Sequence, residues 1–452
     1  MAKKFQFRRG GKTPLHLLEE QSENEASSAR PLRFSFEGLR KITVYVARNI
    51  LRILRDVAAW GVFAVLAFCL AVSMMTNQSP WNVVMGRPPE NNQQAVLIWN
   101  DEDQQNGVSS VISVSDDQTV LANQLTQQTG TVLRIDSKGD ALRSSSVVFK
   151  EYSLFVWADS RSSVWLHRGD KVLKKFKADG SEDWSRRLNS WPEMAWSSSD
   201  GYILIAEQDD KLGQYLRLYS PGGTEVWGDS SPFHLANGSV MDAAIAVDGK
   251  GIALAVLKLD NATPTSYGYL LDQTKRIVHE TSLGSDVVRK AAISNDGTIA
   301  VVGNAFKLCI LRRDENSSRQ ELSLRSALQT LALSPDGSLL AVASAIEPGY
   351  FLENNKTDIQ VYSLLGTEAT SAWSYQLREN IISISVGSQA VSVVTPQWVK
   401  AFTHTGEVAW GMESSSIGAV IRQAIISPSG TIACIRDSRD CLTLWKGSME
   451  DH

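Results

Sequence analysis

The residue types that usually carry catalysis or bind metals are sparse and scattered in this sequence. No glycine-rich phosphate loop, His-x-x-x-His metal pair or nucleophile elbow is present. Paired carboxylates such as Asp116-Asp117 and Asp209-Asp210 fall in turn-like segments, where solvated loop charge is the simpler interpretation. Beyond the first hundred residues the histidines are isolated from one another: His167, His234, His279, His404 and His452. We therefore predict no catalytic, cofactor-binding or metal-binding site, and we expect no cofactor.

The composition indicates a globular protein with an uneven charge distribution. The 452 residues are 43% hydrophobic and 21% charged, which is enough for a sizeable core. A formal charge of −4 argues against nucleic-acid binding by the molecule as a whole. Residues 1–56 hold twelve Lys and Arg against six Asp and Glu, so the remainder of the chain is acidic.

A stretch without charged residues follows the basic N-terminal part. Residues 57–75 (VAAWGVFAVLAFCLAVSMM) form this stretch, and about 20 apolar residues suffice for a helix to cross the bilayer core. A secretory signal is one alternative, but its basic leader is normally short and a small-residue cleavage site follows it. A buried globular helix is the other alternative. We predict an uncleaved transmembrane helix over 57–75.

Basic residues lie mainly on the N-terminal side of this span. Lys41, Arg48, Arg52 and Arg55 precede it, whereas Arg87 is the only basic residue in the segment that follows. Because positive flanks stay in the cytoplasm, we predict an inside N-terminus and an extracytoplasmic C-terminal domain. The expected localisation is the cell membrane, with a single pass.

The segments on either side of the span have distinct patterns. Residues 1–38 are polar with mixed charge, which predicts a disordered cytoplasmic tail. Residues 39–56 carry apolar residues at helical spacing and the same four basic residues on much of the other face. This pattern predicts a basic amphipathic helix on the anionic inner leaflet, although a plain extension of the anchor helix fits it too. Residues 76–94 are rich in Pro and Asn and are predicted to be a linker.

The cysteines do not define a disulfide framework. Cys309, Cys434 and Cys441 follow the span, and an odd number cannot all pair within one chain. Cys434 and Cys441 could face each other across a hairpin, but the expected register separates them by one residue. The sequence leaves their pairing open.

From residue 95 onward, short strands and tight turns recur. The segments AAISNDGTIAVVG (291–303), LALSPDGSLLAVAS (331–344) and AIISPSGTIACIR (424–436) each predict a strand, a turn and a second strand. In the Pro-Asp-Gly form, Pro335 fixes φ and Gly337 supplies the left-handed residue that closes the turn.

The spacing of these turns defines the repeat. Weaker copies lie near Asp117, Asp200 and Asp248, and two degenerate copies are expected at 150–158 and 386–394. The turns then recur about every 45 residues, which is the period of four-stranded propeller blades. This period predicts eight repeats.

A second pattern places a tryptophan four residues after a glycine. The pairs are Gly180 with Trp184, Gly223 with Trp227 and Gly406 with Trp410. We predict that each glycine forms the turn between the third and fourth strands of a blade. Trp184, Trp227 and Trp410 are then expected to dock against the neighbouring blade, rather than to form a cofactor site.

The last repeat lacks a fourth strand. Residues 424–445 supply three strands before the chain ends, while AVLIWN (95–100) is a strand without a partner of its own. Pairing the two ends in one blade leaves no open sheet edge. We therefore predict an all-β fold over 95–447, an eight-bladed propeller closed by an N-terminal strand, with seven blades as the alternative.

The repeats resemble known propeller families. The Gly-x-x-x-Trp endings are similar to those of pyrroloquinoline-quinone-type repeats, and the Pro-Asp-Gly hairpins resemble WD-type repeats, over roughly 95–447. Such propellers host many unrelated functions. Quinone-dependent dehydrogenases of this group carry a vicinal disulfide and a calcium site, but this chain has no adjacent cysteine pair. The resemblance is to the non-catalytic branch, which includes the propeller lipoprotein of outer-membrane barrel assembly.

The predicted loops differ in length between the two faces of the propeller. Turns joining the first to the second strand and the third to the fourth are short and share one face. Loops joining the second to the third strand, and crossovers between blades, share the opposite face and contain insertions at 188–196, 258–269 and 345–358. These insertions carry residues that suit partner recognition: Trp191, Pro192, Tyr267, Tyr350 and Phe351. Folding of these side chains back onto the blades is the alternative.

These features favour a non-catalytic, membrane-anchored propeller that binds a protein or an envelope polymer through the face with the long loops. A propeller enzyme, either a hydrolase or a quinoprotein, is one alternative; it should gather acidic, His or Arg side chains at the central channel. An envelope sensor acting on the basic helix is another, although a flexible linker would transmit a signal poorly.

Overall fold

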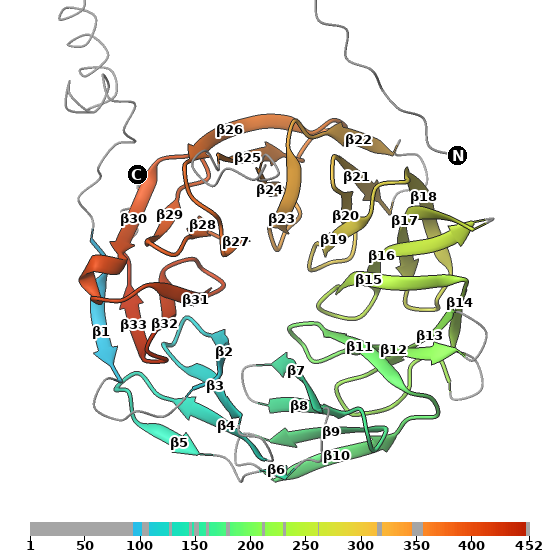
Figure 1. The fold of residues 1–452 in the computed structure, drawn as a ribbon, viewed down its shortest axis with the longest axis horizontal. Helices are drawn as coiled ribbons and strands as arrows, with labels where there is room; N and C mark the ends of the chain where they lie inside the picture. Colours follow the sequence, from blue (N-terminus) through green and yellow to red (C-terminus); the bar gives the residue numbers. More distant parts are fainter. Residues whose placement is uncertain are drawn as a thin grey trace, which may run out of the picture. The chain divides into compact units, whose positions relative to one another are not determined.

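The structure places the strands of the C-terminal part in a ring of antiparallel sheets (Figure 1). This computed structural model describes residues 94–448, except 102–107, 126–128, 144–146, 149–152, 160–161, 178–180, 210–212, 229–231, 261, 314–318 and 346–355. The predicted tail, amphipathic helix and transmembrane helix lie outside the described residues. Within the described part of the chain, no helix has the length and apolar character needed to cross a bilayer.

The described strands form eight sheets, each of which is one blade. Blade 1 contains β2 (Ser110–Val114), β3 (Val120–Leu125), β4 (Thr129–Ile135), β5 (Ala141–Arg143) and β6 (Val147–Val148). Blade 2 contains β7 (Ser153–Asp159), β8 (Ser162–His167), β9 (Val172–Lys177) and β10 (Glu182–Arg187). Blade 3 contains β11 (Pro192–Ser197), β12 (Ile203–Asp209), β13 (Gly213–Tyr219) and β14 (Phe233–Ala236). Blade 4 contains β15 (Gly238–Ile245), β16 (Gly251–Asp260), β17 (Thr263–Asp272) and β18 (Ile277–Gly284).

The remaining blades follow the same order, from the channel outward. Blade 5 contains β19 (Val288–Ile293), β20 (Ile299–Asn304), β21 (Lys307–Arg312) and β22 (Gln320–Ser323). Blade 6 contains β23 (Ala327–Leu333), β24 (Leu339–Ala345), β25 (Thr357–Ser363) and β26 (Thr370–Leu377). Blade 7 contains β27 (Ser383–Val386), β28 (Val391–Val394), β29 (Trp398–Phe402) and β30 (Val408–Glu413), and the 3-10 helix η2 (Ser414–Ser416) follows it. Blade 8 contains β31 (Ile421–Ile426), β32 (Ile432–Asp437), β33 (Leu442–Lys446) and, as its outer strand, β1 (Val96–Asn100).

The architecture confirms the predicted eight-bladed all-β propeller, and the seven-bladed alternative is wrong. The two degenerate repeat positions contain β7 and the β27–β28 hairpin. In the Pro-Asp-Gly turn between β23 and β24, Gly337 has a φ of 75°, which is the left-handed conformation expected of it.

Burial along each blade follows from its neighbours. A second strand is covered on both faces by the adjacent blades, so β24 is buried at every residue and its sequence is LLAVASA without alternation. Outer strands lie at the rim of the ring, and β18 alternates between exposed and covered positions along much of its length. The hydrophobic core of the described residues therefore consists of layers between neighbouring blades, seven of which are defined, from blades 2 and 3 around the ring to blades 8 and 1.

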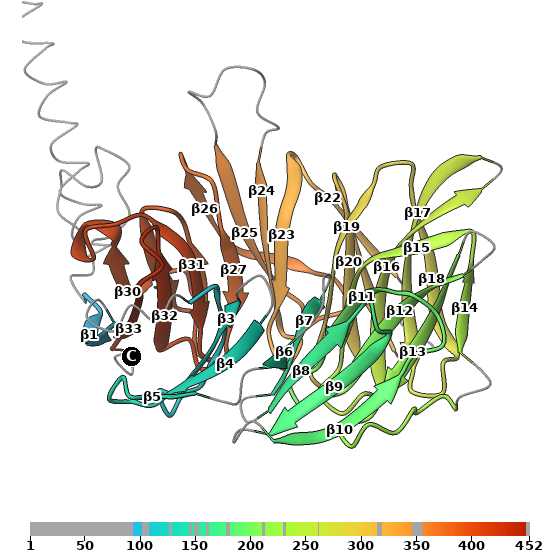
Figure 2. The same cartoon turned by 60° about the horizontal axis from the view of Figure 1, so that its bottom comes forward.

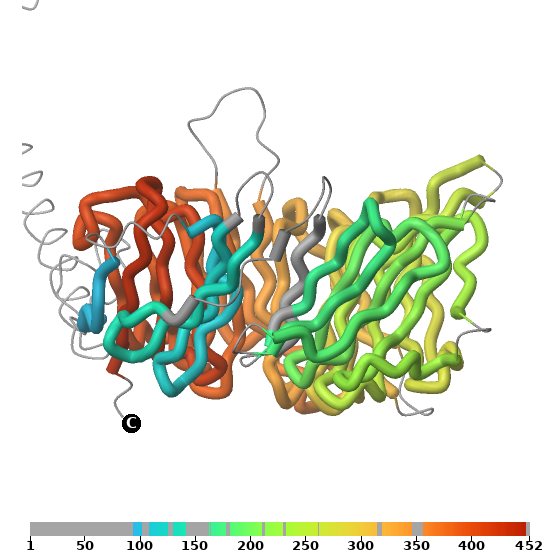
Figure 3. The backbone as a smooth tube through the Cα atoms, turned by 90° about the horizontal axis from the view of Figure 1, so that it is seen from below, coloured from blue at the N-terminus to red at the C-terminus, as the bar shows by residue number. Residues whose placement is uncertain are grey.

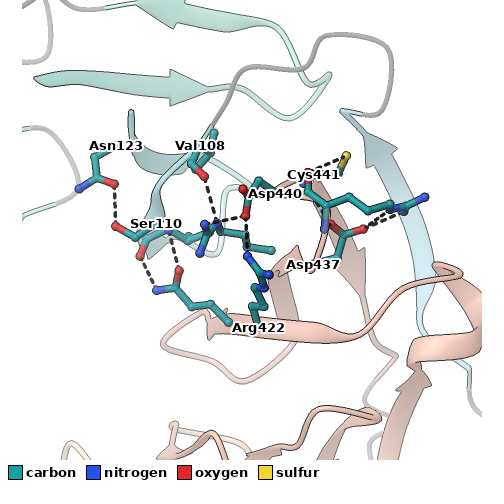
Figure 4. Close-up of polar contacts among 11 residues, drawn as sticks. Val108, Ser110, Asn123, Arg422, Asp437, Asp440 and Cys441 are labelled. Carbon is teal, nitrogen blue, oxygen red and sulfur yellow. Dashed lines mark hydrogen bonds and ion pairs between the residues drawn. The ribbon is translucent and has the colours of Figure 1, made fainter. Parts of the chain in front are cut away.

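The ring closes through blade 8, as predicted. β1 pairs antiparallel with β33, with Asn100 opposite Thr443. Side chains then fasten blade 8 to blade 1 (Figure 4). The Gln423 amide exchanges two hydrogen bonds with the backbone of Val111 (2.9 and 2.8 Å), and Arg436 Nε donates to Val108 O (3.0 Å). Partners more than three hundred residues apart in sequence thus form the closing seam.

The two faces of the ring are defined by the direction of the strands. The face that carries the first-to-second and third-to-fourth strand turns is called the short-turn face. The opposite face carries the second-to-third strand loops and the crossovers between blades, and it is called the long-loop face. On the long-loop face, the β16–β17 hairpin extends beyond its neighbours because these two strands have ten residues each (Figures 2 and 3).

The tryptophans of the Gly-x-x-x-Trp pattern lie between blades. Trp184 Nε1 donates to Pro221 O (3.0 Å) in the third-to-fourth strand turn of the next blade, and its ring lies against Gly223. Trp227 Nε1 likewise donates to Gln273 O (2.8 Å) in blade 4. A glycine in this pattern therefore receives the tryptophan of the preceding blade, besides forming its own turn.

The same contact recurs where the sequence pattern is broken. Trp373 on β26 donates from Nε1 to His404 O (3.0 Å) and packs against Gly406, although it lies seven residues after Gly366. Trp99 on β1 packs in the same way against Gly139 of blade 1. Blade 8 has no third-to-fourth strand turn, because its outer strand comes from the other end of the chain.

Trp410 uses a different contact for that reason. Its Nε1 donates to Gly430 O (3.0 Å), in the first-to-second strand turn of blade 8, and its ring lies against Gly447. The cysteine pairing left open by the sequence is absent: Cys434 is a buried thiol on β32, and it forms no disulfide with Cys441 in the following loop.

Candidate functional site

Trp191 and Pro192 were the first predicted interaction residues, and only one of them is accessible. The crossover between β10 and β11 spans 188–191, and β11 begins at Pro192. Pro192 is buried, so its side chain is not available to a partner. Trp191 is 36% exposed, and the Arg168 guanidinium lies over its ring at 5.8 Å.

The other predicted residues fall into two groups. Tyr267 lies on strand β17 rather than in a loop, and it donates from its hydroxyl to Asp260 Oδ2 (2.6 Å). Lys258 Nζ lies 4.9 Å from its ring centroid, and the hydrogen bond to Asp260 raises the pKa of Tyr267 above its ordinary value. Both contacts hold the Tyr267 side chain against the β16–β17 hairpin. Six predicted residues lie outside the described part of the chain: Tyr350, Phe351, Lys41, Arg48, Arg52 and Arg55.

Exposed hydrophobic side chains gather on neighbouring blades of the ring. Of the eleven large ones in the described residues, five lie in loops, crossovers or strand ends of the long-loop face, and two more, Met194 and Met241, lie midway along first strands. Val420 belongs to blade 8. The other six occupy blades 3, 4 and 5 and the crossover that enters them, and we call them the apolar rim: Trp191, Met194, Met241, Leu259, Val287 and Phe306. Sequence reasoning identified only Trp191, because it considered aromatic residues and proline within the predicted insertions, and Phe306 lies outside them.

Buried polar side chains hold the apolar rim in place from below. Ser266 on β17 is fully buried, donates to Asp286 O (2.6 Å) and accepts from Val288 N (2.8 Å). These two bonds clamp the crossover on both sides of Val287, which is 49% exposed. The crossover therefore presents an apolar side chain on a fixed backbone, which lowers the entropy cost of binding.

Asn304 does the same for Phe306. Its side-chain oxygen accepts from Phe306 N (3.0 Å) and Lys307 N (2.7 Å), while its amide donates to Leu283 O (2.7 Å). Asn304 is 1% exposed, whereas Phe306 is 44% exposed. The two-residue loop between β20 and β21 is thus held by hydrogen bonds, although the side chain of Phe306 faces solvent.

A buried ion network supports the Trp191 crossover. Glu207 on β12 accepts from Ser190 N (3.2 Å) and from Arg217 Nε (3.3 Å), and Arg217 Nη1 also donates to Glu225 (2.8 Å). Burial raises the pKa of Glu207, although Arg217 acts in the opposite direction. Gln208 N donates to Trp191 O (2.8 Å), so residues of β12 fix both ends of the exposed turn.

Charged groups at the channel mouth serve packing between blades. Asp242 on β15 accepts from Trp196 Nε1 (3.3 Å) and Ala291 N (3.1 Å), and so joins the first strands of blades 3, 4 and 5. Burial raises the pKa of Asp242 against the effect of Lys290. Arg289 Nη1 donates to Leu328 O (2.9 Å) in blade 6, whereas Arg422 pairs with Asp440 (3.3 Å) within blade 8.

A cleft of about 510 Å³ lies on the outer side, between blades 2 and 3. Arg186, Arg187, Asn189, Thr224 and Glu225 contribute to its lining. Arg186 Nε donates to Gly223 O and so joins blade 2 to blade 3, whereas Glu225 binds Arg217 within blade 3. Within the described ranges, no group of three or more His, Cys, Asp or Glu side chains is arranged to hold a metal ion.

Comparison with known proteins identifies the fold but no family. No family model matches the sequence. No curated protein matches it either. Among solved structures, the C-terminal WD40 domain of Sif2 is similar, with a TM-score of 0.55 at 10% identity over 78% of this chain and 98% of that domain. Sqt1 from Chaetomium thermophilum, bound to the N-terminus of the ribosomal protein L10, gives 0.54 at 11% identity over 78% of this chain and all of that one. The chain has the WD40-type β-propeller fold.

Proposed function

We propose that this protein is a single-pass membrane protein whose extracytoplasmic propeller binds a protein partner through its long-loop face. The observation that carries the proposal is the apolar rim, in which exposed hydrophobic side chains are presented on loops clamped from below. Surface hydrophobic residues that gather on one face of a protein commonly mark an interaction site. The uncharged segment 57–75 and its basic flank support the membrane anchor.

The fold and the direction of β1 agree with this function. A propeller of the same type, Sqt1, is bound to a peptide segment of another protein, which supports a similar use of the scaffold here. β1 runs antiparallel to β33, so it begins at the short-turn face and leads to the long-loop face. The chain therefore enters the propeller on the face opposite to the long-loop face.

Photocrosslinking in native membranes tests the proposal. A photoreactive amino acid at Phe306 should capture one discrete protein partner, because this side chain is exposed on a rigid loop. The same residue at Leu365, which is 83% exposed on the short-turn face, is the matched control and should capture none. Phe306→Asp should lower the capture from a second photoreactive position, Val287, by about tenfold or more, since an unpaired charge would enter an apolar contact.

Equal capture at Phe306 and Leu365, or no protein adduct at Phe306 and Val287, would exclude a partner on the long-loop face. Correct folding of each variant is checked by its thermal melting curve.

A further inference from the structure

Over blades 5 and 6, the exposed charged residues that the structure describes on the long-loop face are mainly basic. In the described loops, crossovers and adjoining strand ends of these blades, one exposed residue is acidic, Asp286. Four exposed residues are basic: Arg289, Arg325, Lys356 and Arg378. This sign is opposite to that of the chain after residue 56, in which Asp and Glu outnumber Lys and Arg, forty-three to thirty-three.

The opposite end of the channel carries the acidic groups. In the described first-to-second strand turns, Lys250 is the exposed basic residue. Five exposed residues of these turns are acidic: Asp116, Asp117, Asp200, Asp296 and Asp336. Among the described residues, the first-to-second strand turns are therefore acidic, whereas the long-loop side of blades 5 and 6 is mainly basic. A field of this kind steers partners of complementary charge.

The basic groups adjoin the apolar rim. Val287 and Arg289 lie two residues apart where the chain enters β19, and both side chains are exposed. Arg289 Nη1 donates to Leu328 O, so the guanidinium is directed across to blade 6, which Arg325 precedes. Hydrophobic contact and positive charge are thus offered together on neighbouring crossovers.

The apolar rim and the neighbouring basic residues together restrict the chemistry of the partner. A polyanionic polymer would neutralise the arginines but leave the apolar rim uncovered, and a purely apolar segment would desolvate the guanidinium groups without pairing them. Arg pairs with carboxylates through two parallel hydrogen bonds. Building on the proposed function, we propose that the partner presents Asp or Glu side chains beside hydrophobic anchors. The anchors lie on the apolar rim and the carboxylates on Arg289, Arg325 and Arg378.

Short synthetic peptides test this chemistry directly on the full chain in lipid nanodiscs. The probe is a fluorescein-labelled peptide of alternating Leu and Glu with Gly spacers, and two companions replace every Glu by Lys or every Leu by Ser. Fluorescence anisotropy should show binding of the Leu–Glu peptide that weakens with added salt, because exposed charges are screened. The double variant R325E/R378E should weaken it by about tenfold, as expected for loss of complementary charge. The control K138E, on the short-turn face, should leave it unchanged.

Each other outcome overturns the inference in a distinct way. Equal or tighter binding of the Leu–Lys peptide would contradict an acidic partner, while crosslinking from Phe306 could still uphold the protein-binding function. Equal binding of the Ser–Glu peptide would indicate a polyanion, and would remove the role of the apolar rim. Failure of all three peptides, or unchanged affinity in R325E/R378E, would also reject the inference. Phe306 crosslinking without peptide binding would leave only the general proposal standing.

Discussion

At the scale of single residues, glycine and tryptophan form a chain of contacts from blade to blade. Gly223 shows both functions of the glycine: its φ of 77° closes a turn, and its missing side chain leaves room for Trp184 of the preceding blade. Trp227, four residues further on, passes the same contact to the next blade. Spacing in the sequence reveals the pair but not that its two members contact different blades.

Gly223→Ala should separate these two requirements. A Cβ at this position would lie 2.6 Å from Trp184 Cδ2, in addition to the strain of a positive φ. We expect a loss of about 2–4 kcal/mol in the free energy of unfolding, measured by urea denaturation. Gly228→Ala is the control, because Gly228 has a φ of 80° and no atom within 4 Å of its added Cβ. Its expected loss is about 1–2 kcal/mol, and equal losses would contradict tight docking of Trp184.

The aspartates of the short turns predict a specific acid sensitivity. Ser115 Oγ and Thr119 N donate to Asp117 Oδ1, and these hydrogen bonds lower its pKa below the ordinary 3.8. The stabilisation is then complete above the ordinary pKa and is lost as the pH falls through the lower pKa of the folded state. The pKa values of Asp296 and Asp336 are also lowered, by the serines and backbone amides of their turns, which outweigh burial.

In Asp117→Asn, the free energy of unfolding should therefore decrease less steeply than in the parent protein as the pH is lowered below about 4. Ser115→Ala should have a smaller effect in the same direction, since it removes one donor to the carboxylate. Parallel pH profiles for both variants and the parent protein would show that the turn does not couple folding to this carboxylate. Chemical denaturation at several pH values gives the profiles.

At the scale of elements, the blades are joined by backbone as well as by side chains. Val247 N donates to Asn295 O (3.0 Å), and Asn295 N donates to Pro335 O (2.8 Å), so three successive first-to-second strand turns are linked around the channel. Such bonds cannot be inferred from one repeat, because each hairpin already satisfies its own pattern. The strand β1 is the most consequential element, since it comes from the other end of the propeller sequence.

Removal of β1 should open the ring. Deletion of residues 1–101 takes away the outer strand of blade 8 and with it Trp99, which is 8% exposed. Burial of one aromatic side chain alone contributes about 3–5 kcal/mol, and the freed edge of β33 can pair with other chains. We expect a lower melting temperature and aggregation in size-exclusion chromatography. Deletion of residues 1–93 keeps β1 and is the control; similar behaviour of both truncations would contradict closure by β1.

At the scale of the whole molecule, the predicted anchor sets which side of the membrane the propeller occupies. Lys41, Arg48, Arg52 and Arg55 precede the span 57–75, so the propeller is expected outside the cytoplasm. An epitope tag after His452 should be accessible to protease on intact cells or spheroplasts, whereas a tag before Met1 should be protected.

Deletion of 57–75 should release the protein from the membrane fraction after carbonate extraction. Protection of the C-terminal tag in intact cells would contradict the orientation, and retention of the deletion variant in the membrane would contradict an anchor at 57–75.

The amino-acid sequence alone determined the propeller, its eight blades and the strand that closes it. These depend on features that the sequence shows directly: alternation of apolar residues within a strand, recurring turns such as Pro335-Asp336-Gly337, and an N-terminal strand that supplies the one missing from the last repeat. The tertiary structure decided what faces solvent. Pro192 is buried and Phe306 is exposed, although proline is usually exposed in proteins and phenylalanine usually buried.

The reason is that exposure in a propeller depends on the neighbouring blade, which lies about 45 residues away in sequence. Ser266 and Asn304 hold the apolar rim from inside the fold, and no local pattern distinguishes them from other polar strand residues. The periodicity of the sequence thus predicted the fold, whereas the candidate site forms only where separate repeats come together in the tertiary structure.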